Sequence, residues 1–229
     1  ADHLVGATNP LVVRPGPTLA GSVRVPGDKS VTHRALLCGL LAAGTTVIEG
    51  ANPGADCLAT RRCAAALGAE VTGPPEAPQV RGTAGRLSAP PAALDCGNSG
   101  TTLRLLAGVL AGQPFEATLV GDESLSRRPV ARVVEPLRRM GATLTARDGD
   151  RLPPLTVRGG PLRGVTFTHP TASAQVSSAI LLAAVQATGL TGVTTTGGVR
   201  DHTARMLPAF GVPLEQRERS CGPLEIRLA

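Results

Sequence analysis

Three segments of the chain are apolar on every side and resemble one another. Each is rich in leucine and alanine and has almost no polar face, and they occupy residues 35–43, 103–111 and 179–187. A helix that is apolar all round is normally buried on all sides. The pattern therefore predicts three buried helices spaced along the chain.

The same succession of elements follows each predicted buried helix. A β-like run comes first, at residues 45–48, 116–120 and 192–196. An amphipathic helix comes next, at residues 56–67, 129–140 and 201–210. Because glycine just past the last turn favours the left-handed stop of a helix, these helices are expected to end at Gly68, Gly141 and Gly211. A further β-like run then begins, at residues 70–71, 143–146 and 213–215.

The unit is a strand, a buried helix, a strand, an amphipathic helix and two strands. Three copies cover about residues 20–85, 86–155 and 156–229. The period exceeds that of the common solenoid repeats, which favours a closed three-fold packing over an open array. We expect a mixed α/β (α+β) fold with three helices inside and sheets outside. Residues 1–19 lie outside the repeat and are expected to form a tail or crossover segment, or an extra strand at 11–14.

The composition adds a close-packed core and a reducing environment to this picture. The 229 residues are 42% hydrophobic with no Trp, no Tyr and three Phe, so small aliphatic side chains must fill the core. Five cysteines without a Cys-x-x-Cys pair give little support to a disulfide framework or a zinc site. Residues 1–10 lack the features of a signal peptide, and no apolar run is long enough to span a bilayer. We therefore expect a cytoplasmic protein that does not contact membranes.

The net charge of +6 suits anionic partners, although it also serves ordinary solubility. No run of Lys and Arg exceeds two residues, and aromatic stacking residues are nearly absent. Both features argue against nucleic acid as the partner. Small anions remain the better match.

Small, hydroxyl-rich or glycine-rich segments open the three buried helices, at residues 27–34, 97–104 and 173–178. The free N–H groups and the dipole of a helix start bind anions, although Ser and Asn there are also ordinary N-caps. Lys29, Arg34 and Arg104 place positive charge near two of these starts, and a bound anion would remove the conflict with the dipole. Three equivalent positions favour one anion-binding face.

Two loops that precede amphipathic helices are also basic. Residues 121–129 carry Arg127 and Arg128 ahead of Pro129, a residue that suits the first helical position. The third repeat carries Arg200-Asp201-His202 at the matching place. Each loop alone could be a solvated connection, but their equivalent positions favour a binding role.

Four short signatures resemble those of the enolpyruvyl transferase family. They are Pro-Gly-Asp-Lys-Ser at 26–30 with Arg34, Gly-Asn-Ser-Gly-Thr at 97–101 with Arg104, Ser-Arg-Arg-Pro at 126–129, and Ser-Ala-Gln at 173–175. In this order they are most similar to the 5-enolpyruvylshikimate-3-phosphate synthase branch. The branch that acts on UDP-N-acetylglucosamine usually has Lys-Asn at the place of Lys29-Ser30 and lacks the Asn-Ser-Gly-Thr pattern.

The resemblance implies an inverse α/β barrel (a prism) of three βαβαββ units. It implies transfer of the enolpyruvyl group of phosphoenolpyruvate to the 5-hydroxyl of shikimate-3-phosphate, with release of phosphate. No metal or organic cofactor is implied. The Ser-Ala-Gln triplet and Arg200-Asp201-His202 resemble the subclass that includes glyphosate-tolerant enzymes. Gly100, which is not alanine, is nevertheless expected to leave room for glyphosate.

The resemblance also assigns roles to residues of this sequence. The implied ligands of shikimate-3-phosphate are Lys29, Ser30, Arg34, Ser173, Ala174, Gln175 and Arg200. Those of phosphoenolpyruvate are Lys29, Gly100, Arg128 and Gln175, and the implied catalytic residues are Lys29, Arg128 and Gln175. Asn98, Thr101 and Arg104 are expected to shape the second loop. These types fit the chemistry, because guanidinium groups bind phosphate and carboxylate bidentately and a lysine between two anions stabilises developing negative charge.

Members of the family are roughly twice as long as this chain, and their second domain adds an Asp, a Glu and further basic residues to the site. We therefore expect an N-terminal domain without its C-terminal partner, which binds shikimate-3-phosphate weakly and does not turn over alone. Three alternatives stay open. The chain could be a non-catalytic anion- or phosphosugar-binding domain, half of a UDP-N-acetylglucosamine enolpyruvyl transferase, or a structural repeat domain whose helix starts carry only caps.

Overall fold

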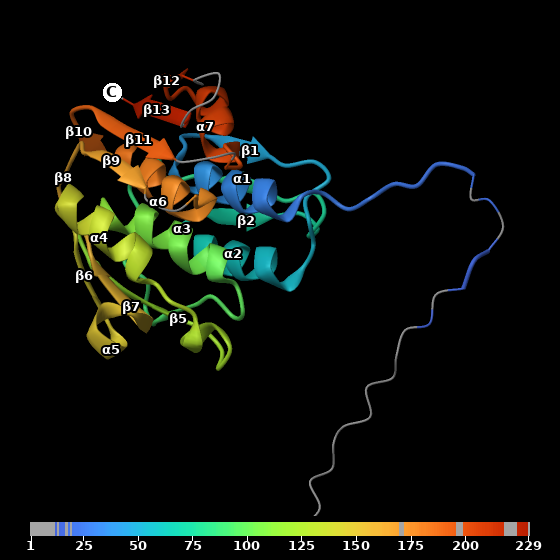
Figure 1. Ribbon diagram of the computed structural model, residues 1–229, viewed down its shortest axis with the longest axis horizontal. Helices are drawn as coiled ribbons and strands as arrows, with labels where there is room; N and C mark the ends of the chain where they lie inside the picture. Colours follow the sequence, from blue (N-terminus) through green and yellow to red (C-terminus); the bar gives the residue numbers. More distant parts are fainter. Residues whose placement is uncertain are drawn as a thin grey trace, which may run out of the picture.

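Three helices lie side by side in the body of the molecule, with the sheets and the other helices around them (Figure 1). The structure, a computed structural model, describes residues 12, 14–16, 18, 20–169, 172–195, 199–217 and 224–228. The three helices are α1 (Lys29–Leu41), α3 (Gly100–Ala111) and α6 (Ala174–Ala184). Most of their side chains are buried, which confirms the three predicted buried helices.

The ends of these helices were predicted less well than their positions. The apolar run at 179–187 continues beyond α6, whose last residue is Ala184, and Ala187–Thr188 form the short strand β10 instead. Strand β10 pairs in parallel with β8 (Leu162–Arg163). An apolar pattern does not mark a helix end, because a buried strand uses the same residue types.

The second and third repeats form four-stranded sheets with the same order. In the second repeat the order is β4-β5-β7-β6, formed by β4 (Leu94–Asp95), β5 (Glu116–Val120), β6 (Thr143–Ala146) and β7 (Leu152–Arg158). In the third it is β9-β11-β13-β12, formed by β9 (Thr166–His169), β11 (Thr191–Thr195), β12 (Leu214–Arg217) and β13 (Leu224–Leu228). In both sheets the first two strands are parallel and the other neighbours are antiparallel. The βαβαββ unit is therefore confirmed in these two repeats.

The first repeat has a smaller sheet than the unit predicts. It contains β1 (Thr45–Val47), β2 (Glu70–Thr72) and β3 (Gln79–Arg81) in the order β1-β3-β2. Residues 21–26, which stand where a first strand is expected, lie outside this sheet, and Val23 is 86% exposed. The predicted strand at 11–14 lies largely outside the described residues.

The amphipathic helices are α2 (Ala55–Ala66), α4 (Ala131–Met140) and α7 (His202–Met206), the last continued by the 3₁₀ turn η2 (Leu207–Phe210). The predicted stops Gly68, Gly141 and Gly211 all have positive φ, at 103°, 118° and 78°. Helix α4 begins at Ala131, two residues after the expected Pro129, and the carbonyl of Pro129 accepts a hydrogen bond from Arg104. Two single turns complete the fold, η1 (Leu125–Arg127) and α5 (Arg147–Asp150).

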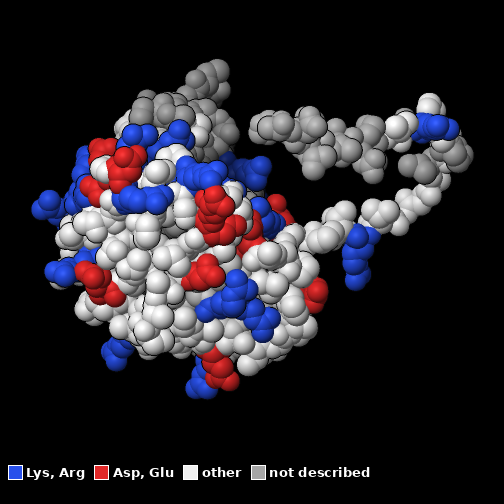
Figure 2. All heavy atoms as spheres, turned by 90° about the horizontal axis from the view of Figure 1, so that it is seen from below, with Lys and Arg blue, Asp and Glu red and all other residues white. Residues whose placement is uncertain are grey.

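The described cysteines and the charged surface can be compared with the reducing environment and the anionic partners that the composition predicts. Cys38, Cys57, Cys63 and Cys96 are free and buried, and the described residues contain neither a metal-binding cluster of His, Cys, Asp and Glu nor a helix that could span a membrane. Cys221 lies outside the described residues. On the face seen in Figure 2, basic and acidic side chains are interspersed over a broad uncharged surface. The excess of positive charge is therefore not gathered into one stripe on that face.

Helices α3 and α6 approach each other very closely. A β-carbon at Gly108 would lie 2.1 Å from the carbonyl oxygen of Ala179, far inside van der Waals contact. Only glycine therefore permits this spacing at position 108. The close approach agrees with the predicted core of small aliphatic side chains. The two helices are held with their starts at the same end of the molecule.

We predict that Gly108→Ala lowers the free energy of unfolding by at least about 2 kcal/mol, because overpacking against backbone cannot be relieved by a side-chain rotation. Urea unfolding measures this change. Gly160→Ala is the matched control, since a β-carbon at Gly160 meets nothing within 4 Å. Equal midpoints for the two variants would contradict the close approach.

Candidate functional site

The starts of α1, α3 and α6 are capped in the same way. Asp28, Ser99 and Ser173 each accept a hydrogen bond from the backbone N–H three residues later, at 2.8, 3.1 and 3.4 Å. The N-cap interpretation is therefore correct for all three starts. Each cap occupies one of the free N–H groups of its helix start, so it does not by itself exclude anion binding.

A hollow of about 320 Å³ opens between the starts of α1 and α6. Its lining residues are Ser30, Arg34, Thr101, Ala172, Ser173, Ala174, Gln175, Val199, Arg200 and His202. Six of the seven residues expected to hold shikimate-3-phosphate are among them. The structure thus brings together residues from the first and third repeats that the sequence placed far apart.

Lys29, the seventh residue, does not line this hollow and is engaged by α2 instead. Its ammonium lies 2.8 Å from a carboxylate oxygen of Asp56, in the first turn of α2, while its side chain stays 53% exposed. The carboxylate suits that position, because negative charge is favourable at a helix start. Asp56 was not singled out from the sequence, and the 27 residues between the two groups left no local signal.

Arg34 is buried, at 2% exposure, and braces three elements. Its Nε donates to the Thr203 hydroxyl at 2.7 Å, Nη2 to the Ser178 hydroxyl at 2.6 Å, and Nη1 to the Ser30 carbonyl at 2.8 Å. Burial lowers the pKa of Arg34, but a guanidinium remains charged at neutral pH. Because the acceptors of these three hydrogen bonds are neutral and Asp28 acts only at a distance, the buried positive charge can act on the hollow that Arg34 lines.

Arg104 joins the second helix start to the third. Its Nη1 donates to the Gly100 carbonyl at 3.1 Å and to Oε1 of Gln175 at 3.0 Å, and Nη2 donates to the Pro129 carbonyl at 2.8 Å. Gln175 in turn donates to the Thr101 hydroxyl at 2.9 Å. The expected role of Arg104 and Thr101 in shaping the second loop agrees with these contacts. Burial and the nearby Arg128 and Arg132 lower the pKa of Arg104.

Arg128 and Asn98 meet on the far side of the α3 start. Arg128 donates through Nη2 to the Ser124 hydroxyl at 3.0 Å and to the side-chain oxygen of Asn98, and through Nη1 to the Asn98 carbonyl at 3.3 Å. Asn98 donates to a carboxylate oxygen of Asp122 at 2.7 Å. A hydrogen bond from the backbone N–H of Leu125 is the main cause of the lowered pKa of Asp122. The basic loop is thereby ordered next to Gly100 rather than solvated at random.

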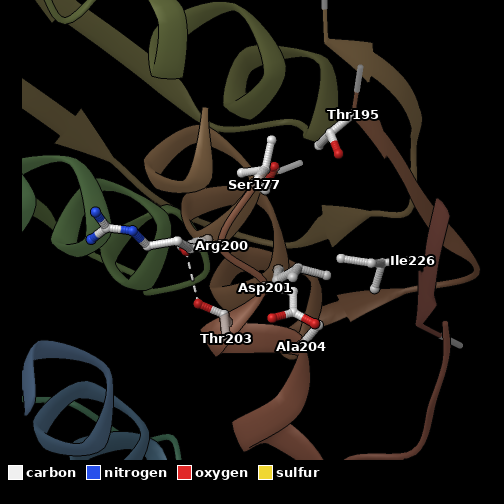
Figure 3. A pocket seen from close by; sticks show the side chains of 10 residues that line it. Ser177, Thr195, Arg200, Asp201, Thr203, Ala204 and Ile226 are labelled. Carbon is white, nitrogen blue, oxygen red and sulfur yellow. Dashed lines mark hydrogen bonds between the residues drawn. The ribbon is translucent and has the colours of Figure 1, made fainter. Parts of the chain in front are cut away.

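A second, much smaller cavity of about 10 Å³ shares Val199 and Arg200 with the lining of the hollow (Figure 3). It is lined by residues that include Ser177, Thr195, Arg200 and Thr203. In Figure 3 the side chain of Arg200 points away from this cavity. Arg200 therefore contributes its backbone here, and its guanidinium is left for the larger hollow.

A hydrogen-bonded group that the sequence did not reveal lies beneath the first two helix starts. It contains His33, Thr60 and Thr102, from α1, α2 and α3. No spacing rule connects these positions, since 27 and 42 residues separate the successive partners. Sequence reasoning missed the group because its members become neighbours only through the packing of three helices.

Residues from three helix starts line one basic hollow in this α/β domain, and comparisons with known proteins identify its family. A profile described as EPSP synthase (3-phosphoshikimate 1-carboxyvinyltransferase) matches residues 13–222. The 3-phosphoshikimate 1-carboxyvinyltransferase of Brevibacillus brevis is 51% identical over 203 residues, covering 88% of this chain and 48% of that protein. The enzyme of the same name from Acidithiobacillus ferrooxidans is 51% identical, covering 92% of this chain and 49% of that protein.

Comparison of the fold with solved structures identifies the same family. A structure of EPSP synthase from Acinetobacter baumannii superimposes with a TM-score of 0.84 at 42% identity, covering 91% of this chain and 46% of that one. The chain therefore belongs to the EPSP synthase family, and its fold is the inverse α/β barrel of that family. It spans about half the length of the curated relatives it matches.

The burial of His33 predicts a pH dependence of stability. Burial is the main cause that lowers the pKa of His33 to about 4, from 6.5. The charged groups near it are Asp28, Lys29 and Arg34 from α1 and Asp56 from α2. Since the unfolded chain binds the proton more readily, stability is fully present above pH 6.5. It should fall by up to about 3 kcal/mol as the pH drops through the window between 6.5 and 4.

Chemical denaturation at several pH values measures this loss. His33→Asn, which does not titrate, should flatten the slope between pH 6.5 and 5, whereas His202→Asn, at a less buried position, serves as the control. A slope that is unchanged in His33→Asn would show that His33 is not the group responsible.

Proposed function

We propose that this chain forms the shikimate-3-phosphate wall of an enzyme that transfers the enolpyruvyl group of phosphoenolpyruvate. The observation that carries the proposal is the 320 Å³ hollow lined by Ser30, Arg34, Ser173, Gln175 and Arg200. Guanidinium groups match a phosphate, and hydroxyl and amide groups match the hydroxyls of a polyol ring. Membership of the EPSP synthase family supports the choice of shikimate-3-phosphate over other phosphosugars.

Phosphoenolpyruvate is proposed to bind beside this hollow, at the start of α3. Gly100 permits close approach of a ligand to the backbone, and Arg128 supplies a guanidinium held by Asn98 and Ser124. Gln175 lines the hollow and is bonded to Arg104 and Thr101, so it stands between the two proposed subsites. Lys29 would reach both substrates from the other side, sharing its ammonium with Asp56.

The proposed reaction is an addition followed by an elimination. The 5-hydroxyl oxygen of shikimate-3-phosphate bonds to C2 of phosphoenolpyruvate while C3 gains a proton and the hydroxyl loses one. The resulting tetrahedral intermediate then loses phosphate from C2 and a proton from C3, which restores the double bond. Lys29, Arg128 and Gln175 would stabilise the developing charge and hold the reacting atoms in place.

Proton transfer in this scheme is proposed to use carboxylates in addition to the groups of the hollow. Among the described residues that line it there is no carboxylate. The resemblance implies an Asp and a Glu in the half of the relatives that the chain does not cover. We therefore propose that turnover requires that half, in cis or in trans, and that this chain alone binds without turnover.

The setting and the competing functions follow from the same observations. The four free, buried cysteines support a reducing, cytoplasmic location. The two curated relatives reported above are both named 3-phosphoshikimate 1-carboxyvinyltransferase, which favours this substrate over UDP-N-acetylglucosamine. A non-catalytic anion-binding domain would have the same hollow, so only a measurement of turnover distinguishes it from half of an enzyme.

Calorimetry with shikimate-3-phosphate at low salt tests the proposal. The wild-type chain should bind weakly, and Arg200→Gln should bind at least about tenfold more weakly because it loses a charge-assisted contact with the phosphate. Arg81→Gln is the matched control, since Arg81 is 74% exposed in its side chain and lies on β3, away from the hollow. Unchanged melting temperatures would show that both variants fold.

Turnover separates the enzyme from a binding domain. The chain should release phosphate only after the uncovered half of the Brevibacillus brevis relative is added, and Lys29→Ala should abolish that release. Steady release by the chain alone would contradict the requirement for the second half. Absence of heat with shikimate-3-phosphate would contradict the assignment of the hollow.

A further inference from the structure

Helix α2 carries none of the residues expected to touch substrate, yet it links the first two helix starts. Thr60 on α2 lies 2.6 Å from Nδ1 of His33 on α1, measured from its hydroxyl oxygen. The same oxygen lies 2.7 Å from the hydroxyl oxygen of Thr102 on α3. All three side chains are essentially buried, at 0% exposure for His33. The result is a hydrogen-bonded chain that crosses three helices.

The far end of this chain fixes its direction. The Thr102 hydroxyl lies 3.2 Å from the carbonyl oxygen of Asp56 and 2.7 Å from the hydroxyl of Ser99, the N-cap of α3. A carbonyl oxygen can only accept a hydrogen bond, and each hydroxyl has one proton to give. Thr102 therefore donates its proton to the Asp56 carbonyl and accepts a hydrogen bond from Thr60. The single hydroxyl proton of Thr60 is used in that bond, so Thr60 accepts a hydrogen bond from His33.

This direction determines which nitrogen of His33 carries the proton. Nδ1 must be the donor, so the neutral imidazole is protonated at Nδ1 and Nε2 is a bare lone pair. Nε2 is buried and has no hydrogen-bond partner among the described residues. The other tautomer would bury an N–H without an acceptor, which native structures rarely tolerate. Two independent observations thus agree on the same tautomer.

The chain ends where both proposed subsites are built. Asp56, whose carbonyl accepts from Thr102, holds Lys29 through its carboxylate at 2.8 Å. Ser99, whose hydroxyl lies 2.7 Å from that of Thr102, caps the helix that begins at Gly100. Any loosening of the Thr60 link would therefore let the Lys29 and Gly100 loops move independently of each other.

We propose that His33, protonated at Nδ1, is a positioning residue whose one-way hydrogen-bond chain through Thr60 and Thr102 holds the α3 start against α1 and α2. What those loops bind rests on the proposed function, but the chain itself does not. His33 acts only through Thr60 and Thr102 and touches no substrate. Its task is to set the spacing between the shikimate-3-phosphate and phosphoenolpyruvate subsites.

Nitrogen-15 spectra of the histidine-labelled chain at pH 7 provide the first test. We expect the signature of an Nδ1-protonated neutral ring for His33. An Nε2-protonated ring, or an equal mixture of the two tautomers, would overturn the proposal. This measurement requires no variant and no substrate.

Amide hydrogen exchange in variants provides the second test. Thr60→Val keeps the shape of the side chain but breaks the link, and it should speed exchange at Thr102 and Leu103 at least tenfold. The amides of Val176 and Ser177, bonded in the same way to the cap of α6, are the internal control and should not change. Thr60→Ser should restore protection, and His33→Asn, which keeps an N–H donor near Nδ1, should protect better than His33→Leu.

The outcomes distinguish this inference from the proposed function. Faster exchange confined to the α3 start supports the positioning role, together with a raised KM for phosphoenolpyruvate and little change in that for shikimate-3-phosphate in the reconstituted enzyme. Unchanged exchange in Thr60→Val, or equal loss at α3 and α6, overturns it. Failure of the wild-type chain to support turnover with the added half would count against the proposed function alone.

Discussion

The spacing of α3 and α6 is the constraint on which the rest of this structure depends. The backbone of Ala179 lies so close to Gly108 that no β-carbon fits between them. The starts of α3 and α6 lie together, since Gln175 bonds to both Arg104 and Thr101, and the described strands pair in the same order in the second and third repeats. The capped starts of α1, α3 and α6 consequently lie near one another, and residues from separate repeats share one hollow.

Two guanidinium groups give that geometry its positive charge. Arg34, which is buried, and Arg104, which is half-buried, donate to neutral carbonyl, hydroxyl and amide oxygens. The carboxylate of Asp28 acts on Arg34 only from a distance. Burying a charge is costly, and positive charge at a helix start opposes the dipole. In the proposed function, an anion in the hollow would offset both costs for Arg34, which also braces the fold.

The sequence predicted the repeating architecture well because hydrophobic periodicity is a local property. Strands at 116–120 and 143–146 and the glycine stops at Gly68, Gly141 and Gly211 are confirmed. Most of the proposed ligands, which the four signatures identified, line one hollow in the structure. Helix ends were less predictable, since Pro129 precedes α4 by two residues and the apolar run at 179–187 continues past the end of α6.

Contacts between elements that lie far apart in the sequence could not be predicted at all. Arg34 meets Thr203 across 169 residues, and Lys29 meets Asp56 across 27, with no spacing rule to connect them. The chain from His33 to Thr102 is of the same kind. The sequence therefore locates the residues of the site, but their partners, and with them the electrostatics, follow only from the packing of the three helices.

A titration of the nitrogen-15 labelled chain with shikimate-3-phosphate, followed by amide chemical shifts, tests the central claim most directly. The account predicts that the largest shifts fall on amides at two helix starts at once, those near Ser30 and those near Gln175, with smaller shifts near Thr101. Shifts confined to a single helix start, or centred on the opposite ends of α1 and α6, would contradict a shared anion site built by the close packing of the three helices.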